Sequence, residues 1–203
     1  MKLEVTQDII EYLKSKDNVF EMLSNRYGLI SIELDNNLFE AVIINIVGQM
    51  LSKKVADKMY DRLLSLCDGN ITPNSLKKIT RDEIRACGIS FSKADYILEF
   101  ADKFANNEYD LTSLDKLNDF ETIKCLRQIK GVGKWTAEML ALFALGKQNI
   151  FSYDDVALKN GIMKSKGFKT LSQKRFEVLR KKYSPYCSFA SLYFYRFNDD
   201  EEI

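Results

Sequence analysis

The chain has 203 residues, of which 46% are hydrophobic and 29% charged, with only 9 Gly and 2 Pro. This composition suits a globular helical protein and argues against disorder or a sandwich of short strands. Thirty basic and 29 acidic residues leave a net charge of +1, so bulk charge does not indicate a nucleic-acid partner. The chain contains no histidine, which excludes mechanisms that need a histidine base or metal ligand.

The first 37 residues are predicted to form one helix followed by a polar turn. They contain no long apolar run, so neither a signal peptide nor a membrane span is expected, and a cytoplasmic location is predicted. From Leu38 to Leu64 apolar residues recur every three or four positions, a spacing that predicts helix packed into a core.

The same helical spacing covers residues 94–104, 123–129 and 135–143, so the chain is expected to be nearly all helical. Asn118 and Glu121 form a candidate capping box, and Ser184 before Pro185 is a candidate helix start. Residues 146–153 break the spacing and are predicted to lead into a new helix near Asp154 or Asp155.

The four cysteines are widely spaced with no C-x-x-C pair, so they indicate buried thiols and neither a zinc nor an iron-sulfur site. Residues 159–196 contain ten basic residues and one acid, Glu177. This segment is a candidate footprint for phosphates, and a solvated lysine-rich helix face is the alternative.

The most informative segment, residues 126–137, reads L-R-Q-I-K-G-V-G-K-W-T-A. A helical pattern stops at Gly131-Val132-Gly133, and another begins at once. Backbone amides at the start of the second helix could bind a DNA phosphate, aided by the helix dipole. A tight helix-helix turn without a ligand is the alternative.

With its flanks, this segment resembles the hairpin of the helix-hairpin-helix DNA glycosylase superfamily. Further stretches agree in order, and they resemble the bacterial inducible 3-methyladenine-DNA glycosylases in particular: F-E-A-V-I-I-N-I-V-G-Q-M-L-S (39–52), R-A-C-G-I-S-F-S-K-A-D-Y-I (85–97), F-S-Y-D-D-V-A-L-K-N (151–160) and Y-S-P-Y-C-S-F-A-S-L-Y-F-Y (183–195).

The resemblance covers residues 38–197 and implies an all-α fold in which two helical subdomains flank a DNA-binding cleft. It predicts a single domain over residues 1–203, with residues 1–37 as an amino-terminal helical extension. The hairpin motif occupies residues 126–137. The amino-terminal β-rich domain of longer members has no room in this chain.

Asp155 is the residue that the resemblance places in the catalytic position. A carboxylate near the anomeric carbon stabilises the positive charge that develops when an N-glycosidic bond breaks, and it can orient the attacking water. The alternative is that an aspartate at a helix start serves only as an N-cap.

Trp135 occupies the position where superfamily members with lyase chemistry carry a Schiff-base lysine. Lys134, one residue earlier, is expected to point toward phosphates, because one residue is about 100° of rotation on a helix. The resemblance therefore implies a monofunctional hydrolase that leaves an abasic site.

An aromatic wall favours a cationic base, so alkylated purines of the 3-methyladenine and 7-methylguanine type are the expected substrates. The base pocket is predicted from Trp135, Met139, Val156, Phe194 and Tyr195. Met139 and Val156 stand where the inducible enzyme has tyrosines, which weakens the aromatic character of the pocket. Tyr193 is a further candidate for the pocket. The alternative is that the carboxy-terminal helix closes the core with Phe189, Leu192, Phe194 and Tyr195.

The remaining expected site residues bind DNA or a cation. Met50 is the candidate wedge that fills the gap left by a flipped base, with its place in an apolar helix stripe as the alternative. The other predicted DNA-binding residues are Gln49, Ser52, Gly131, Val132, Gly133, Lys134 and Thr136. Main-chain carbonyls of Arg127, Ile129 and Val132 are the expected ligands of a structural monovalent cation.

The function expected from the resemblance is thus that of a monomeric DNA N-glycosylase acting on a damaged base in double-stranded DNA during base excision repair. No nucleotide cofactor, catalytic cofactor, iron-sulfur cluster or membrane partner is expected. The alternatives are a non-catalytic helix-hairpin-helix DNA-binding protein and a glycosylase for a different damaged base.

Overall fold

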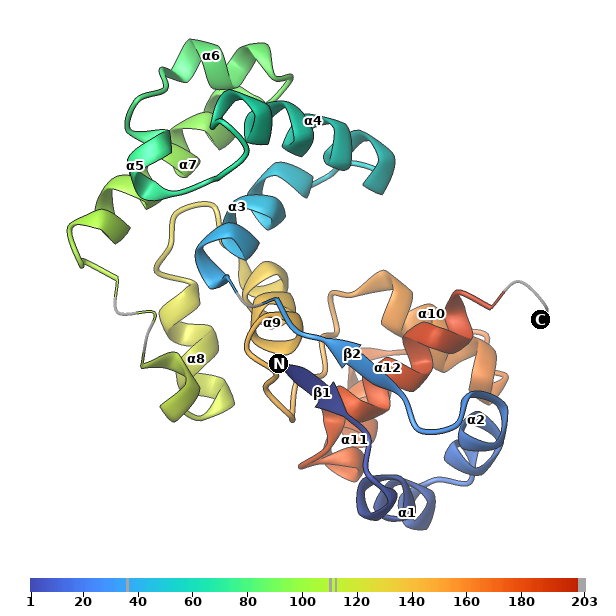
Figure 1. Cartoon of the computed structure of the whole chain (residues 1–203). Coiled ribbons are helices and arrows are strands. Elements are labelled where there is room, and N and C mark those ends of the chain that lie inside the picture. Colours follow the sequence, from blue (N-terminus) through green and yellow to red (C-terminus); the bar gives the residue numbers. More distant parts are fainter. Residues whose placement is uncertain (36, 110, 112, 201–203) are drawn as a thin grey trace. The chain divides into compact units, whose positions relative to one another are not determined.

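A computed structural model describes residues 1–35, 37–109, 111 and 113–200 (Figure 1). These residues are mostly helical, as predicted, with one small antiparallel sheet. None of the described helices is long and apolar enough to cross a membrane. The elements in chain order are β1 (Lys2–Glu4), α1 (Gln7–Lys16), α2 (Val19–Tyr27), β2 (Ser31–Glu33), α3 (Leu38–Gly48), α4 (Lys53–Leu66), α5 (Pro73–Leu76), α6 (Arg81–Ala86), α7 (Phe91–Ala105), the 3-10 helix η1 (Leu114–Lys116), α8 (Asp119–Leu126), α9 (Lys134–Phe143), α10 (Val156–Lys166), α11 (Gln173–Tyr183) and α12 (Cys187–Asn198).

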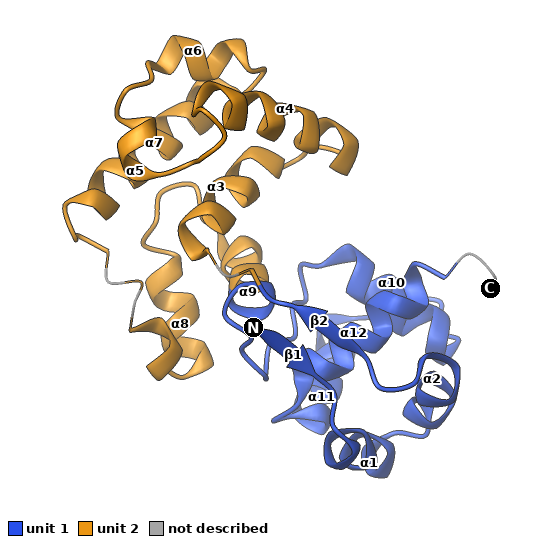
Figure 2. Cartoon of the chain, in the orientation of Figure 1, with its two compact units in different colours: residues 1–34, 141–203 blue, residues 35–140 orange. Residues whose placement is uncertain are grey.

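The chain divides into two compact units, which Figure 2 distinguishes by colour. Unit 1 consists of residues 1–34 and 141–203, and unit 2 consists of residues 35–140. Helix α9 passes from unit 2 into unit 1 along the chain. The prediction of a helical fold with two subdomains is therefore confirmed, and each unit is described separately below.

Unit 1 contains the amino-terminal residues as an integral part. Strands β1 and β2 pair antiparallel, with Leu3 opposite Ile32, and α1 and α2 lie between them in the chain. The prediction of one helix in this region is wrong, since two helices and two strands are present. The strands were missed because three residues are too few to produce a recognisable alternation of apolar and polar residues.

The core of unit 1 is aromatic and forms around α10 and α12. Phe20, Tyr183 and Phe194 are fully buried, and their ring centroids lie 5.1 to 6.0 Å apart. Gly161 of α10 lies directly against α12, since a Cβ at this position would come within 2.0 Å of the Phe194 carbonyl oxygen. Only glycine permits this close approach of the two helices.

A cluster around the buried carboxylate of Asp17 connects the end of α1 to α10 and α11 in unit 1. The Asp17 carboxylate accepts hydrogen bonds from Lys166 Nζ (2.8 Å), Lys182 Nζ (3.0 Å) and Tyr183 Oη (2.7 Å). Burial alone would raise the pKa of Asp17, but the three donors outweigh it and lower that pKa to about 2. Part of the basic segment 159–196 is thus used within the fold.

Unit 2 packs α3 and α7 around a second aromatic cluster. The Phe39 ring stacks on Phe100 with centroids 5.1 Å apart, and Phe104 lies 4.9 Å from Phe39. The capping box of Asn118 and Glu121 forms at the start of α8, as predicted. The apolar run 38–64 contains a break at residues 49–52, between α3 and α4, which the helical spacing did not predict.

Two smaller predictions have mixed outcomes. Cys67, Cys87 and Cys187 are buried free thiols, as predicted, whereas Cys125 is partly exposed. The prediction that Ser184 starts a helix is wrong, because α12 begins at Cys187, and the Ser184 carbonyl instead accepts a hydrogen bond from Tyr12 Oη at 2.5 Å.

Candidate active site and nucleic-acid interface

The predicted hairpin is present in unit 2 between α8 and α9. The Ile129 carbonyl accepts a hydrogen bond from Val132 N–H (3.0 Å), and Gly133 O accepts the first intrahelical bond, from Ala137 N–H (2.9 Å). Gly131 has φ +86°, and a Cβ there would lie 2.5 Å from the Tyr96 ring, so glycine is required for both reasons. The turn therefore leads directly into the first turn of α9.

Consecutive residues of this turn are exposed. Gly133, Lys134 and Trp135 are all on the surface, and Trp135 is 40% exposed. The amides of residues 134–136 occupy the first helical turn, where no carbonyl of the same helix is available as an acceptor. The side chains of Val132 and Thr136 are buried, so these residues could contact a phosphate only through their backbone.

The loop between α3 and α4 carries the predicted wedge. Met50 is fully exposed and has φ 59°, a left-handed conformation that is rare for a residue other than glycine, asparagine or aspartate. Its place in this loop contradicts the alternative that it continues the apolar stripe of a helix. Ser52, also predicted to bind DNA, is exposed at the N-cap of α4.

Gln49 joins this loop to the hairpin. Its side-chain amide Nε2 donates a hydrogen bond to the Gly131 carbonyl at 2.7 Å. Two segments that are 82 residues apart in the sequence thus form one surface region of unit 2. We call residues 49–52 the wedge loop and residues 126–137 the hairpin.

Two predicted base-pocket residues lie in α9 within unit 2. Trp135 and Met139 are four residues apart and therefore lie on the same face of the helix. Met139 is buried, whereas Trp135 presents part of its ring to solvent. Lys134 Nζ lies 3.8 Å from the carboxylate of Glu138, one helical turn further on.

Asp155 lies in unit 1 at the start of α10. It is only 6% exposed, whereas the neighbouring Asp154 is on the surface. Its Oδ1 accepts a hydrogen bond from Leu158 N–H at 2.8 Å, which makes it the N-cap of α10. The bond from Leu158 N–H fixes the orientation of the carboxylate at the positive end of the helix dipole.

The other three predicted base-pocket residues of unit 1 have different environments. Val156 follows Asp155 and is 65% exposed, whereas Phe194 is 0% exposed in the aromatic core. In this conformation Phe194 offers no surface to a base, so the structure supports the core alternative for it. Tyr193 is also buried; its hydroxyl donates to Gly28 O at 2.8 Å, and burial raises its pKa to about 12.

Tyr195 lines a pocket of about 720 Å³ within unit 1. Its ring centroid lies 6.0 Å from that of Phe143. Neither Asp155 nor Val156 is among the residues that line this pocket, which are Arg26, Tyr27, Ile30, Ser31, Ile32, Phe143, Leu192, Tyr195, Arg196 and Asp199.

No group of three or more Asp, Glu, Cys or His side chains that could hold a metal ion occurs among the described residues. The predicted cation ligands are backbone carbonyls at the end of α8 and in the hairpin turn. The bond from Val132 N–H uses one lone pair of the Ile129 carbonyl and leaves the second.

Sequence reasoning missed two exposed lysines beside the wedge loop. Lys53 and Lys54 occupy the first turn of α4, directly after Ser52. Positive charge at a helix N-terminus is unfavourable for the helix. The two lysines can be recognised in the sequence once the break at residues 49–52 is known. Their charge would be offset by an external anion bound at the start of α4.

Taken together, the fold and these residues define a two-unit helical protein with a helix-hairpin-helix motif followed by a buried aspartate that caps a helix. The sequence model of the HhH-GPD superfamily of base excision DNA repair proteins matches residues 43–185. The chain therefore belongs to this superfamily, and the resemblance predicted from the motifs is confirmed.

Individual relatives agree with this assignment. The chain is 29% identical over 196 residues to the alkylbase DNA glycosidase-like protein mag2 of Schizosaccharomyces pombe, covering 92% of this chain and 91% of that protein. A crystal structure of DNA-3-methyladenine glycosidase from Bacillus halodurans superposes with a TM-score of 0.84 at 27% identity, covering 98% of this chain and 93% of that chain.

The fold is also shared with 3-methyladenine DNA glycosylase Mag1 of Schizosaccharomyces pombe, solved in complex with abasic DNA. That comparison has a TM-score of 0.80 at 23% identity and covers 97% of this chain and 99% of that chain. Such coverage includes most of residues 1–37, so the amino-terminal strands and helices are part of the shared fold.

Proposed function

We propose that this protein is a monofunctional DNA N-glycosylase that removes alkylated purines from duplex DNA by hydrolysis, with Asp155 as its catalytic carboxylate. The observation that carries the proposal is the buried Asp155, which caps α10, in a chain of the base excision repair superfamily. The names of the two relatives above, an alkylbase glycosidase-like protein and a 3-methyladenine glycosidase, support alkylated bases as substrates.

In the proposed reaction, the bond between C1′ of the deoxyribose and the base nitrogen breaks, and its electron pair leaves with the base. An alkylated purine already carries a positive charge, so it departs as a neutral base without a general acid. The fixed Asp155 carboxylate stabilises the positive charge on the sugar. Water then adds to C1′ and passes a proton to the Asp155 carboxylate, which leaves an abasic site.

Unit 2 supplies the proposed DNA contacts. The exposed start of α9 would bind a phosphate through backbone amides and Lys134, and Met50 would fill the space vacated by the flipped nucleotide. Trp135 and Met139 of unit 2 remain proposed contacts of the base, and Val156 and Tyr195 of unit 1 remain separate candidates for that role. The proposal requires that both units act on the same DNA molecule, with one protein monomer per lesion.

The absence of a lysine at position 135 supports simple hydrolysis. Lys134 is oriented toward Glu138 along the helix, one residue away from the position that forms a Schiff base in superfamily lyases. Borohydride trapping should therefore yield no covalent adduct between protein and DNA. A trapped adduct would contradict the monofunctional assignment.

A monovalent cation at the hairpin is part of the proposal. The backbone carbonyls of Arg127, Ile129 and Val132 are hard oxygen donors without charge, which suit sodium or potassium better than a transition metal. Bound there, the ion would hold the turn and add positive charge close to a DNA phosphate. Its role is structural, and no step of the reaction depends on it.

The decisive experiment measures base release from defined duplexes that contain 3-methyladenine, 7-methylguanine, hypoxanthine or uracil. We expect the wild type to release the two alkylated purines and the Asp155→Asn variant to release neither at a comparable rate. If another base is released instead, the protein is a glycosylase with a different specificity. If wild type and variant are equally inactive but bind DNA, the non-catalytic binding function replaces the proposal.

A further inference from the structure

The wedge loop has the backbone geometry of a β-turn that Met50 alone would not favour. The Gly48 carbonyl accepts a hydrogen bond from Leu51 N–H at 3.1 Å. Gln49 has φ −52° and ψ 130°, and Met50 has φ 59°. These angles match the second and third positions of a type II turn, where the positive φ normally selects glycine or asparagine. A type I turn would suit methionine better, and the two turns differ by a flip of the peptide between Gln49 and Met50.

One side chain holds the carbonyl of that peptide. The ammonium of Lys93, near the start of α7, donates to Gln49 O at 2.7 Å and to Val47 O at 2.8 Å. Lys93 is partly buried, and its burial lowers its pKa. Both acceptors lie at the C-terminal end of α3, where the helix dipole and unused carbonyls favour a cation.

The same helix also supports the hairpin. Tyr96, three residues after Lys93 and on the same face of α7, packs its ring against Gly131. Gln49 completes the link through its bond to the Gly131 carbonyl. One turn of α7 therefore contacts both the wedge loop and the hairpin, and all of these residues belong to unit 2.

We propose that Lys93 is a positioning residue that selects the type II turn of the wedge loop and so presents Met50 to DNA in one fixed conformation. The inference rests on the proposed function for its purpose, because Met50 must insert into a duplex. Lys93 does not touch the substrate in this role. It acts through the orientation of one peptide bond, which is already defined before DNA arrives.

The first test does not depend on activity. Hydrogen exchange of the peptide segment 47–53 is compared in the wild type, Lys93→Met and Lys103→Met. Lys103 is a matched control, since it lies on the same helix but pairs with Glu99 at 2.9 Å, away from the wedge loop. We expect exchange in this segment to rise about tenfold in Lys93→Met, which loses the charge-assisted hydrogen bonds to the Gln49 and Val47 carbonyls, and to stay unchanged in Lys103→Met. Equal exchange in all three proteins would overturn the inference.

The second test measures whether Lys93 acts through Met50. In single-turnover base release, Lys93→Met should slow the reaction about tenfold while DNA affinity changes less than about twofold. In a Met50→Ala background, adding Lys93→Met should have no further effect on the rate. In the protein that retains Met50, Lys93→Arg should keep most of the wild-type rate. Additive losses from the two substitutions would refute the mechanism.

The hydrogen-exchange test and the base-release test distinguish a failure of this inference from a failure of the proposed function. A wild type that releases no base from any duplex would disprove the glycosylase function, yet the exchange test would still decide the role of Lys93. If Lys93→Met does not fold, Lys93→Gln takes its place, because its amide can still donate to one of the two carbonyls. The expected result is then an intermediate rise in exchange, and wild-type exchange in this variant counts against the inference.

Discussion

The wedge residue of unit 2 and the proposed catalytic carboxylate of unit 1 lie in opposite environments. Met50 is fully exposed in a turn with a left-handed φ of 59°, and the neighbouring hairpin also turns through a positive φ, +86° at Gly131. In unit 1 Asp155 is buried and caps the start of α10, a helix that packs closely against α12 at Gly161. Gripping and deforming DNA requires exposed backbone and side chains, whereas stabilising a charged transition state requires an immobile, partly dehydrated group.

The largest expected effect separates charge from structure at Asp155. Replacement by Asn should reduce the rate of base release about 10²- to 10³-fold, since it removes the negative charge that stabilises the sugar cation. Asparagine is as good an N-cap as aspartate, so the melting temperature should hardly change. Asp155→Ala should lose both the activity and about 1 kcal/mol of stability. Calorimetry alongside single-turnover assays distinguishes the two effects; an active Asp155→Asn enzyme would remove Asp155 from the chemistry.

The next effect concerns the rigidity of unit 1. Gly161→Ala places a methyl group within 2.0 Å of the Phe194 carbonyl oxygen, and α10 and α12 must then separate. We expect a loss of about 3 kcal/mol in the free energy of unfolding, measured by urea denaturation.

Gly48→Ala in unit 2 is the matched control for this substitution. Its new Cβ would meet only the Ala56 Cβ at an ordinary 3.7 Å, and alanine is the better helix former. Its stability should therefore be equal to or above that of the wild type. Equal losses in both variants would mean that the close contact of α10 and α12 has no special importance.

A pH effect of roughly 2 kcal/mol is expected from the Asp17 cluster of unit 1. The folded pKa of about 2 lies below the ordinary value of 3.8, and each pKa unit corresponds to about 1.4 kcal/mol. The group is more stable as an anion in the folded state, so its contribution is complete above pH 3.8 and is lost as the pH falls through about 2.

The matched comparison uses Asp17→Asn, which cannot ionise at this position. Urea denaturation at pH values from 7 to 2 should show a difference in stability between wild type and variant that is constant down to about pH 4 and shrinks below it. A difference that is independent of pH over this range would show that the carboxylate charge contributes nothing.

The sequence predicted the features that depend on local chemistry. The Asn118 capping box, the hairpin turn and the helix start after Asp155 all follow from short-range preferences, and all three are present. The break between α3 and α4, which the sequence missed, depends on a long-range contact. The break at the wedge loop is held by Lys93 from another helix, so the apolar spacing alone continues through it.

Aromatic residues near the carboxyl terminus illustrate the same limit. Phe194 and Tyr195 are adjacent in α12, yet one is enclosed in the core and the other lines a pocket. Periodicity assigns both to one helix but cannot tell which side faces protein and which faces a cavity. That distinction requires Tyr183 of the preceding helix and the partners Phe20 and Phe143, which come from distant parts of the chain.

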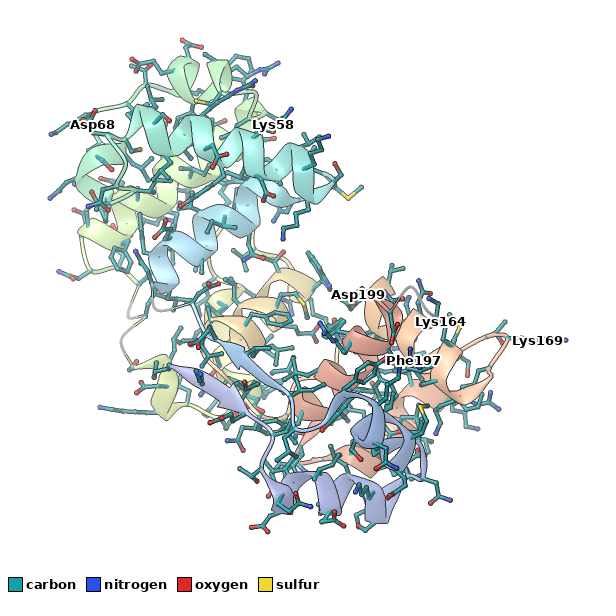
Figure 3. The ribbon with its side chains drawn as sticks, turned by 45° about the vertical axis from the view of Figure 1, so that its right-hand side comes forward. Lys58, Asp68, Lys164, Lys169, Phe197 and Asp199 are labelled. Carbon is teal, nitrogen blue, oxygen red and sulfur yellow. The ribbon has the colours of Figure 1, made fainter. Side chains whose placement is uncertain are left out.

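The smallest expected effect decides which unit holds the DNA backbone. Lys134 is exposed at the hairpin of unit 2, and Lys169 is exposed after α10 in unit 1, where it projects outward near Lys164 (Figure 3).

If the hairpin binds phosphate, Lys134→Ala should reduce the slope of log affinity against log salt concentration by about 0.9, because one fewer counterion is released. Lys169→Ala should leave that slope unchanged, since the basic segment of unit 1 is then a solvated face. Fluorescence anisotropy with the Asp155→Asn protein measures both slopes without turnover. An equal reduction of the salt slope in both variants would mean that unit 1 also binds phosphates, so that DNA-backbone contacts are not confined to unit 2.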